Sequence, residues 1–160
     1  MAGLQNGATF PRLEMAKVGG GEIVLPDDLF GSLGVVLAYR GSWCIRCNAQ
    51  LASFQRLDAE LSAMGIHVIA FSADNEEHAL EMVRSHGLTF PVGFGIDMRK
   101  TGQILQGYIN EERGSLESSN FLLRSDGAIE ISVYSSGPIG RLAPEDVLDY
   151  VSRRRMRGSL

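Results

Sequence analysis

Cys44 and Cys47 are the residues of this chain whose type and spacing are best suited to chemistry. They are its only two cysteines, and two residues separate them. The preceding segment, 33–39, is an apolar run typical of a buried strand, and the following segment, 48–64, has the apolar spacing of an amphipathic helix. A Cys-x-x-Cys pair at a strand-to-helix junction can form and break a disulfide. The sequence therefore predicts a redox-active dithiol.

The residues around Cys44 favour ionisation of its thiol. Cys44 lies near the expected helix start, where free backbone N–H groups and the helix dipole stabilise an anion. Ser42 is expected to be the N-cap, while Arg46 and Arg40 are expected to add positive potential, although Arg40 could instead only cap the strand end. Such surroundings lower a cysteine pKa from about 8.5 to about 3.5–7.5. We therefore expect Cys44 to attack a disulfide or a peroxide, and Cys47, one turn further along, to resolve the product into a disulfide.

Other interpretations of the cysteine pair have weaker support. A zinc site would need a second pair or suitably spaced histidines, and His67, His78 and His86 do not have that spacing. A structural disulfide would close so short a loop that it would constrain the unfolded chain little. Two inert core cysteines are disfavoured by their position after Trp43, which is expected to form a wall of the substrate groove. Neither a metal nor a cofactor is expected.

Composition restricts the class of protein. The chain is 44% hydrophobic and 21% charged, which is ordinary for a soluble globular protein. Its 160 residues predict a single domain, 1–160, that can bury a core without disulfides. A net charge of −4 argues against binding nucleic acid, and no apolar run is long enough to span a membrane. The segment 1–7 has no features of a secretory signal, so a cytoplasmic location is expected.

The remaining patterns predict an α/β fold. Strands at 33–39 and 66–72 alternate with helices at 48–64 and 76–86, which indicates a parallel βαβ unit. Further elements are expected as an N-terminal hairpin (12–17 and 22–25), a short edge strand (90–94), a short helix (98–106), an antiparallel hairpin around Asp126-Gly127 (120–124 and 128–134) and a last helix from Pro144. Together they predict a mixed sheet with helices on both faces.

The chain resembles thioredoxin-fold proteins, and among them the peroxiredoxin-like branch of the alkyl hydroperoxide reductase/thiol-specific antioxidant (AhpC/TSA) family. Residues 35–44, Val-Val-Leu-Ala-Tyr-Arg-Gly-Ser-Trp-Cys, are similar to the family signature that ends in Tyr-Arg-Gly-x-Trp-Cys. Other family landmarks resemble 7–11, 69–74, 87–91 and 121–127. The resemblance implies a thioredoxin-like fold with an N-terminal β-hairpin, an attacking Cys44 and a resolving Cys47. It also implies a peroxide or disulfide substrate, a dithiol reductant protein such as a thioredoxin, and a homodimer.

Several positions depart from the family pattern. Leu37 and Gly41 replace the proline and the hydroxyl residue of the peroxiredoxin motif Pro-x-x-x-Thr/Ser-x-x-Cys, with Ser42 one place away. The arginine that usually precedes the later strand is missing, because 118–120 is Ser-Ser-Asn. The cis-proline of thioredoxins is also missing there, and Ala38 stands near the position of their buried acid.

Three functions remain open from the sequence. The first is a thiol peroxidase, which the family resemblance favours. The second is a thiol–disulfide oxidoreductase acting on protein or small-molecule disulfides, favoured by the intact Cys-x-x-Cys and the altered peroxide motif. The third is a redox-sensing module with little turnover.

Overall fold

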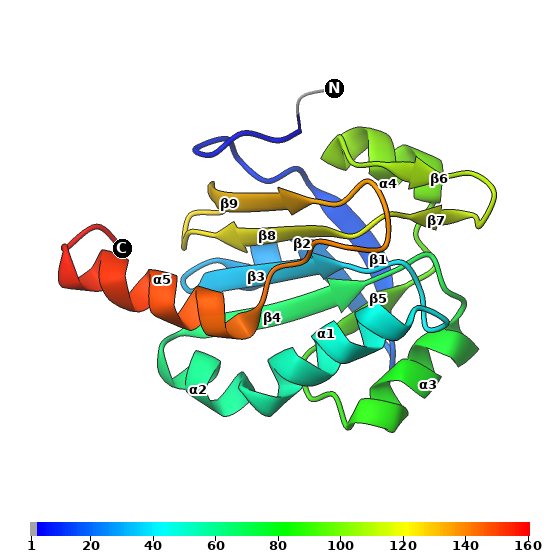
Figure 1. Ribbon diagram of the computed structural model, residues 1–160, viewed down its shortest axis with the longest axis horizontal. Helices are drawn as coiled ribbons and strands as arrows, with labels where there is room; N and C mark the ends of the chain where they lie inside the picture. Colours follow the sequence, from blue (N-terminus) through cyan, green and yellow to red (C-terminus); the bar gives the residue numbers. More distant parts are fainter. Residues whose placement is uncertain (1–2) are drawn as a thin grey trace.

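A mixed seven-stranded sheet forms the centre of the protein, as seen in a computed structural model that describes residues 3–160 (Figure 1). The strand order is β2-β1-β5-β4-β3-β8-β9. The strands are β1 (Leu13–Lys17), β2 (Glu22–Leu25), β3 (Leu33–Ala38), β4 (Ile66–Phe71), β5 (Val92–Phe94), β8 (Ser119–Leu123) and β9 (Ile129–Tyr134). Met1 and Ala2 lie outside the described residues. They belong to the segment 1–7, from which the absence of a secretory signal is predicted.

Strand β3 is buried along its whole length, as its apolar run predicts. It pairs in parallel with β4 on one side and antiparallel with β8 on the other. Val35 and Leu37 face one hydrophobic core, while Val36 and Ala38 face a second core across the sheet. Because both faces are covered, every side chain of β3 is apolar and its end is held firmly. This strand fixes the position at which Cys44 follows.

Helices cover both faces of the sheet, which confirms the predicted arrangement. Figure 1 shows α1 (Ile45–Arg56), α2 (Asp58–Ala63), α3 (Glu76–His86) and α5 (Pro144–Met156) on one side of the sheet. Leu51 and Phe54 of α1, Met82 of α3 and Val147 of α5 share one core there. The other core includes Leu105 of α4 (Met98–Leu105). No helix within residues 3–160 has both the length and the apolar composition needed to cross a membrane.

The single helix predicted over 48–64 is wrong. The structure has two helices, α1 and α2, which meet at Leu57, whose φ of −102° and ψ of 10° depart from helical values. The apolar spacing continues through this break because Leu57 packs against the same core as Leu51 and Leu61. The apolar spacing of the sequence therefore does not indicate the break between α1 and α2. Helix α1 also begins earlier than predicted, at Ile45.

One strand prediction also needs correction. The sequence predicts 90–94 as an edge strand, but β5 lies inside the sheet because β1 pairs with it through Ala16↔Phe94 and Lys17↔Gly93. The predicted N-terminal hairpin is confirmed, and it forms the outer part of that side of the sheet. A small hairpin of β6 (Ile109–Asn110) and β7 (Ser115–Leu116) was not predicted, since two-residue strands carry no periodic pattern.

Candidate active site

Cys44 is placed at the N-terminus of α1 by the end of β3 and a tight turn. Its backbone is extended (φ −87°, ψ 112°), and its Sγ accepts a hydrogen bond from the Cys47 backbone N–H at 3.3 Å. Cys44 is therefore the N-cap itself, and the prediction that Ser42 is the N-cap is wrong. The Ser42 N–H donates instead to Asp74 Oδ2 at 2.8 Å, which ties the turn to the segment after β4.

Gly41 explains why the hydroxyl residue of the peroxiredoxin motif is missing here. Its φ is +158°, and a Cβ built on it would collide with the indole of Trp43 and lie 3.1 Å from Asp74 Oδ1. The Trp43 ring thus occupies the space that a threonine or serine side chain would need. The turn therefore has an aromatic ring beside Cys44 and no hydroxyl donor at position 41.

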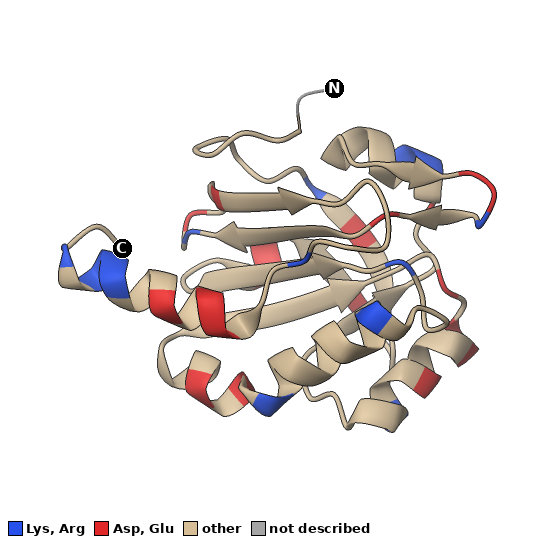
Figure 2. Ribbon diagram, viewed as in Figure 1, with Lys and Arg blue, Asp and Glu red and all other residues tan. Residues whose placement is uncertain are grey.

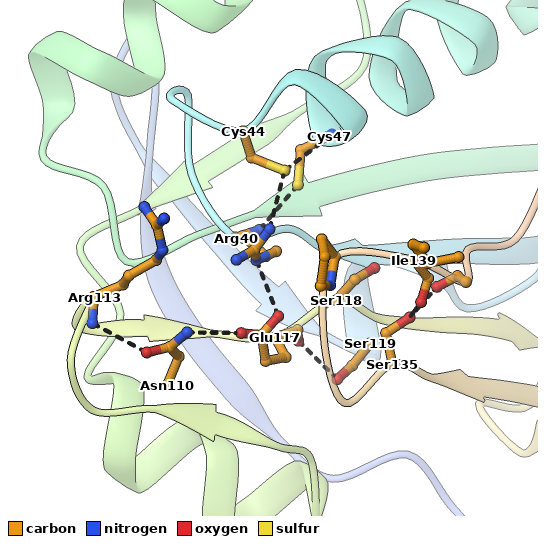
Figure 3. Close-up of polar contacts among 12 residues, drawn as sticks. Arg40, Cys44, Cys47, Asn110, Arg113, Glu117, Ser118, Ser119, Ser135 and Ile139 are labelled. Carbon is orange, nitrogen blue, oxygen red and sulfur yellow. Dashed lines mark hydrogen bonds and ion pairs between the residues drawn. The ribbon is translucent and has the colours of Figure 1, made fainter.

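Two arginine side chains contact the sulfur atoms. Arg40 Nη1 lies 3.8 Å from Cys44 Sγ, while Arg141 Nη2 lies 3.5 Å from Cys44 Sγ and 3.2 Å from Cys47 Sγ. The Arg40 backbone N–H also donates to Cys47 Sγ at 3.4 Å. Figure 3 shows both sulfur atoms directed toward Arg40. Both cysteines are free thiols and buried, Cys44 being 4% exposed and Cys47 fully covered.

These surroundings separate the two thiols in acidity. Burial alone would raise the pKa of Cys44, but hydrogen bonds from Cys47 and the cations Arg141 and Arg40 outweigh it, so its pKa lies below the ordinary value. Burial raises the pKa of Cys47 to about 11, and its hydrogen bond with Cys44 acts in the same direction. Cys44, the sulfur nearer the solvent, is therefore the more acidic thiol of the pair and the one that ionises first as the pH rises.

A buried carboxylate holds Arg40 in place. Glu117 Oε2 lies 2.9 Å from Arg40 Nε, and the two side chains are only 5% and 9% exposed. Glu117 Oε1 accepts a hydrogen bond from Asn110 Nδ2 at 3.0 Å, and the Arg113 backbone N–H donates to Asn110 Oδ1 at 3.1 Å (Figure 3). The β6–β7 hairpin thus supports the arginine beneath Cys44. Ala38 stands near the position of the buried acid of thioredoxins and has no carboxylate. The buried carboxylate of this site is that of Glu117, which pairs with Arg40, and Arg40 in turn contacts Cys44 Sγ.

Trp43 and Arg46 lie at the rim of the site. Trp43 is 44% exposed, and the guanidinium carbons of Arg40 and Arg113 lie 4.8 Å and 4.7 Å from its ring centroid. Such cation–π contacts contribute about 0.5–1 kcal/mol each when exposed. Arg46, which the sequence predicts to add positive potential at Cys44, is exposed on the first turn of α1. Among residues 3–160, the arginines that contact the sulfurs are Arg40 and Arg141.

Arg141 is the site residue that the sequence did not reveal. It lies in the loop between β9 and α5, 97 positions after Cys44, without any local pattern. The loop is held because the Leu142 N–H donates to Asn120 Oδ1 at 3.0 Å and Gln50 Nε2 donates to the Leu142 carbonyl at 2.9 Å. Asn120 belongs to the segment 118–120, where the family pattern has an arginine. Here it holds the loop that carries Arg141.

No group of three or more potential metal ligands from His, Cys, Asp and Glu occurs in the described part of the chain. The charged groups that contact the two thiols are the guanidinium groups of Arg40 and Arg141, and Glu117 pairs with Arg40.

Replacing Arg141 with glutamine is expected to slow alkylation of Cys44 by iodoacetamide at pH 7 by about tenfold. The variant loses a cation that favours the thiolate, and a hydrogen bond to a charged group contributes about 1.5–3 kcal/mol. The rates should be measured across a pH series, with Arg84→Gln, an exposed arginine of α3, as the control. Unchanged alkylation with the pH profile of the parent protein would contradict the role given to Arg141.

Comparison with known proteins identifies the family of the chain. A sequence model of the AhpC/TSA family matches residues 6–131. The thiol-disulfide oxidoreductase ResA of Oceanobacillus iheyensis is 32% identical over 97 residues, covering 57% of this chain and 50% of that protein. ResA of Bacillus anthracis is 30% identical over 151 residues, covering 94% of this chain and 79% of that protein.

Solved structures show the same fold at low sequence identity. Mycobacterium tuberculosis AhpC is 19% identical, with a TM-score of 0.78 over 95% of this chain and 98% of that one. Enterococcus faecalis AhpC is 18% identical, with a TM-score of 0.76 over 96% and 95%. The predicted thioredoxin-like fold and the family resemblance are thereby confirmed. The chain belongs to the AhpC/TSA family and is a thiol oxidoreductase.

Proposed function

We propose that this protein reduces peroxides, with Cys44 as nucleophile and Cys47 as resolving thiol. The observation that carries the proposal is that two guanidinium groups, those of Arg40 and Arg141, contact Cys44 Sγ, next to a second thiol, Cys47, whose pKa is raised to about 11. These groups can replace the hydroxyl residue and the arginine of the family pattern, which this chain lacks at the family positions. They hold the thiolate and present N–H donors to the oxygen atoms of a bound peroxide.

The proposed cycle has three steps. The Cys44 thiolate attacks the terminal peroxide oxygen, the O–O bond breaks, and the departing hydroxide or alkoxide takes a proton from solvent, leaving a sulfenic acid on Cys44. The Cys47 sulfur then attacks Cys44 Sγ, its proton and the sulfenic hydroxyl leave as water, and the disulfide closes. A dithiol protein such as a thioredoxin returns the disulfide to two thiols by exchange and is itself oxidised.

The arginines favour a peroxide over a disulfide because the two leaving groups differ in basicity. Hydroxide is the conjugate base of water, which is a far weaker acid than a thiol, whose ordinary pKa is about 8.5. Only the more basic group gains greatly from two adjacent cations. The 4% exposure of Cys44 also favours a small oxidant over a protein disulfide.

A second candidate is reduction of disulfides. It is favoured by the proximity of the two thiols, with the Cys47 N–H 3.3 Å from Cys44 Sγ, and by the thiol-disulfide oxidoreductases among the relatives. In that reaction Cys44 would form a mixed disulfide, expelling one thiolate, and Cys47 would expel the second.

The two candidates are separated by their oxidants. Reduced protein mixed with hydrogen peroxide in a stopped-flow instrument is expected to change the fluorescence of Trp43, its sole tryptophan, much faster than peroxide oxidises free cysteine. The rate should rise with pH and level off below the ordinary cysteine pKa, as Cys44 ionises. A rate no higher than that of free cysteine, together with rapid reduction of insulin disulfides, would establish the second candidate instead.

A single domain over 1–160, a thioredoxin-like reductant, a homodimer and a cytoplasmic location remain predictions. The single domain is supported by the two cores that share one sheet. The reductant is supported by the exposed Trp43 and Ile45 beside the dithiol, which a partner protein could contact.

A further inference from the structure

A side chain from the first turn of α1 holds the backbone turn that carries Cys44. Asn48 Nδ2 lies 2.8 Å from the carbonyl oxygen of Ser42 and 2.8 Å from that of Cys44. Carbonyl oxygens only accept hydrogen bonds, so the amide nitrogen uses both of its hydrogens there. The two carbonyl groups belong to the residues on either side of Trp43. Asn48 therefore joins the two ends of the short segment that carries the indole and the attacking sulfur.

His86, the last residue of α3, contacts the other end of the Asn48 amide. Its Nε2 lies 2.7 Å from Asn48 Oδ1, across 38 positions of sequence. Because the amide nitrogen faces two carbonyl oxygens, the amide oxygen is the atom that faces the imidazole. His86 must therefore carry a proton on Nε2 and donate it in this bond. The histidine thus fixes the orientation of the amide that holds the turn.

The end of α3 is a suitable place for such a donor. Helix C-termini favour positive charge and N–H donors, and the last turn of α3 has Arg84 beside His86. The acidic residues of the first turn, Glu76 and Glu77, lie at the opposite end of the helix, and Figure 2 shows acidic residues toward that end. His86 is half-buried where α3 packs against α1, so its bond to Asn48 is partly shielded from water.

The contacts that favour the Cys44 thiolate depend on this turn. Its Sγ lies 3.3 Å from the Cys47 backbone N–H, 3.5 Å from Arg141 Nη2 and 3.8 Å from Arg40 Nη1. Burial acts against ionisation, and these donors and cations outweigh it, so the pKa of Cys44 is lowered. If Asn48 did not hold the two carbonyl groups, the turn could rotate and each of these contacts would lengthen.

We propose that Asn48 and His86 are positioning residues of the dithiol: His86 orients the Asn48 amide, and the amide holds Cys44 against the groups that stabilise its thiolate. The hydrogen bonds of the two side chains go to backbone carbonyls and to each other, so they act through the turn and not on a sulfur atom. The role concerns the turn and not a bound oxidant. It therefore applies to the reduction of peroxides and of disulfides alike.

The test measures how alkylation of Cys44 by iodoacetamide depends on pH, with the modified cysteine located by peptide mass spectrometry. Asn48→Ala should move the midpoint of the profile upward by about 0.5–1 pH unit, a threefold to tenfold change in the ionisation equilibrium. His86→Ala should move it upward by less, because the amide remains but is free to turn. The midpoint reports the acidity of Cys44, whereas the rate at high pH reports access to its sulfur.

Two further variants test whether His86 acts through Asn48. His86→Gln can place an N–H close to the position of Nε2, so its midpoint should stay near that of the parent protein. The double variant Asn48→Ala/His86→Ala should have the midpoint of Asn48→Ala alone, because a residue that acts only through Asn48 has no effect without it. Shifts that add in the double variant would overturn the proposal, as would a shift in His86→Gln as large as that in His86→Ala.

Two control variants separate positioning from a general loss of stability. Asp97→Ala removes the N-cap of α4, which accepts from the Lys100 N–H at 3.0 Å and lies on the other side of the sheet. His67→Ala removes an exposed histidine that pairs with Gly34, at the end of β3 remote from Cys44. Asp97→Ala should be less stable than the parent protein, and both controls should keep its midpoint.

An unchanged midpoint in Asn48→Ala would overturn the proposal, as would an equal shift in Asp97→Ala. His86→Ala removes no bond to the turn itself, so it decides the question if Asn48→Ala does not fold. A midpoint in His86→Ala equal to that of the parent protein would then overturn the role of both residues. These outcomes do not depend on the peroxidase function, because iodoacetamide reacts with the thiolate whatever the natural oxidant is.

Discussion

Replacing Cys44 with serine is expected to slow oxidation of the reduced protein by hydroperoxide about 10³–10⁴-fold. The remaining thiol, Cys47, is fully buried and has a pKa raised to about 11, so only about one molecule in 10⁴ is ionised at pH 7. The thiolate is the reactive form, and serine provides none. The rate is measured from Trp43 fluorescence, because this ring contacts Arg40, which in turn contacts Cys44 Sγ.

Cys47→Ser is the matched control for this variant. It keeps Cys44, its position as the N-cap of α1 and the side chains of Arg40 and Arg141, so the first oxidation step should keep the order of magnitude of the parent rate. It cannot close the disulfide. A Cys44→Ser protein that is oxidised as fast as Cys47→Ser would contradict the assignment of the two roles.

Replacing Glu117 with alanine is expected to lower the free energy of unfolding by about 3–5 kcal/mol. The Arg40–Glu117 pair is almost wholly buried, and removing one partner leaves an uncompensated buried charge. Asn110 Nδ2 would lose its acceptor as well. Urea unfolding followed by circular dichroism measures the change, and an exposed pair provides the comparison. Glu145→Gln, which breaks the contact with Arg56 at 3.1 Å, should cost only about 0–1 kcal/mol.

Glu117→Gln keeps the test informative if the alanine variant does not fold. Its amide oxygen can still accept from Asn110 or face Arg40, so the cost should be smaller, about 1–3 kcal/mol. Arg40 contacts Cys44 Sγ, and in this variant it loses its anionic partner. The pH profile of Cys44 alkylation should therefore also shift. Alanine and glutamine variants as stable as the parent protein would show that the buried pair does not hold Arg40.

The parts of the site that the sequence predicted are those encoded locally. The strand before Cys44 and the helix after it follow from periodicity, and their junction places a cysteine at a helix N-terminus in any βα unit. The position of Cys47 one turn along the helix follows from the same geometry. Arg40 lies two residues after the end of β3 and four before Cys44, so its proximity to the dithiol was also predictable.

Arg141 and Glu117 were not predictable for a physical reason. Each comes from a segment without regular structure. Arg141 reaches the sulfurs, and Glu117 reaches Arg40, only through long-range packing. Gln50 illustrates this, because its contact with Leu142 spans 92 positions and holds the Arg141 loop against α1. The sequence alone shows that the family residues are absent. The side chains that take their place could be identified only from the structure. Gly41 is a similar case, since only the position of Trp43 explains the glycine.

The most direct test of the account is to find which sulfur is oxidised first. Cys44→Ser and Cys47→Ser proteins are each treated with one equivalent of hydroperoxide in the presence of dimedone, which traps sulfenic acids, and the adduct is located by peptide mass spectrometry. We expect a dimedone adduct on Cys44 in the Cys47→Ser protein and little or none on Cys47 in the Cys44→Ser protein. An adduct that forms on Cys47 as readily as on Cys44, or on Cys47 alone, would contradict it.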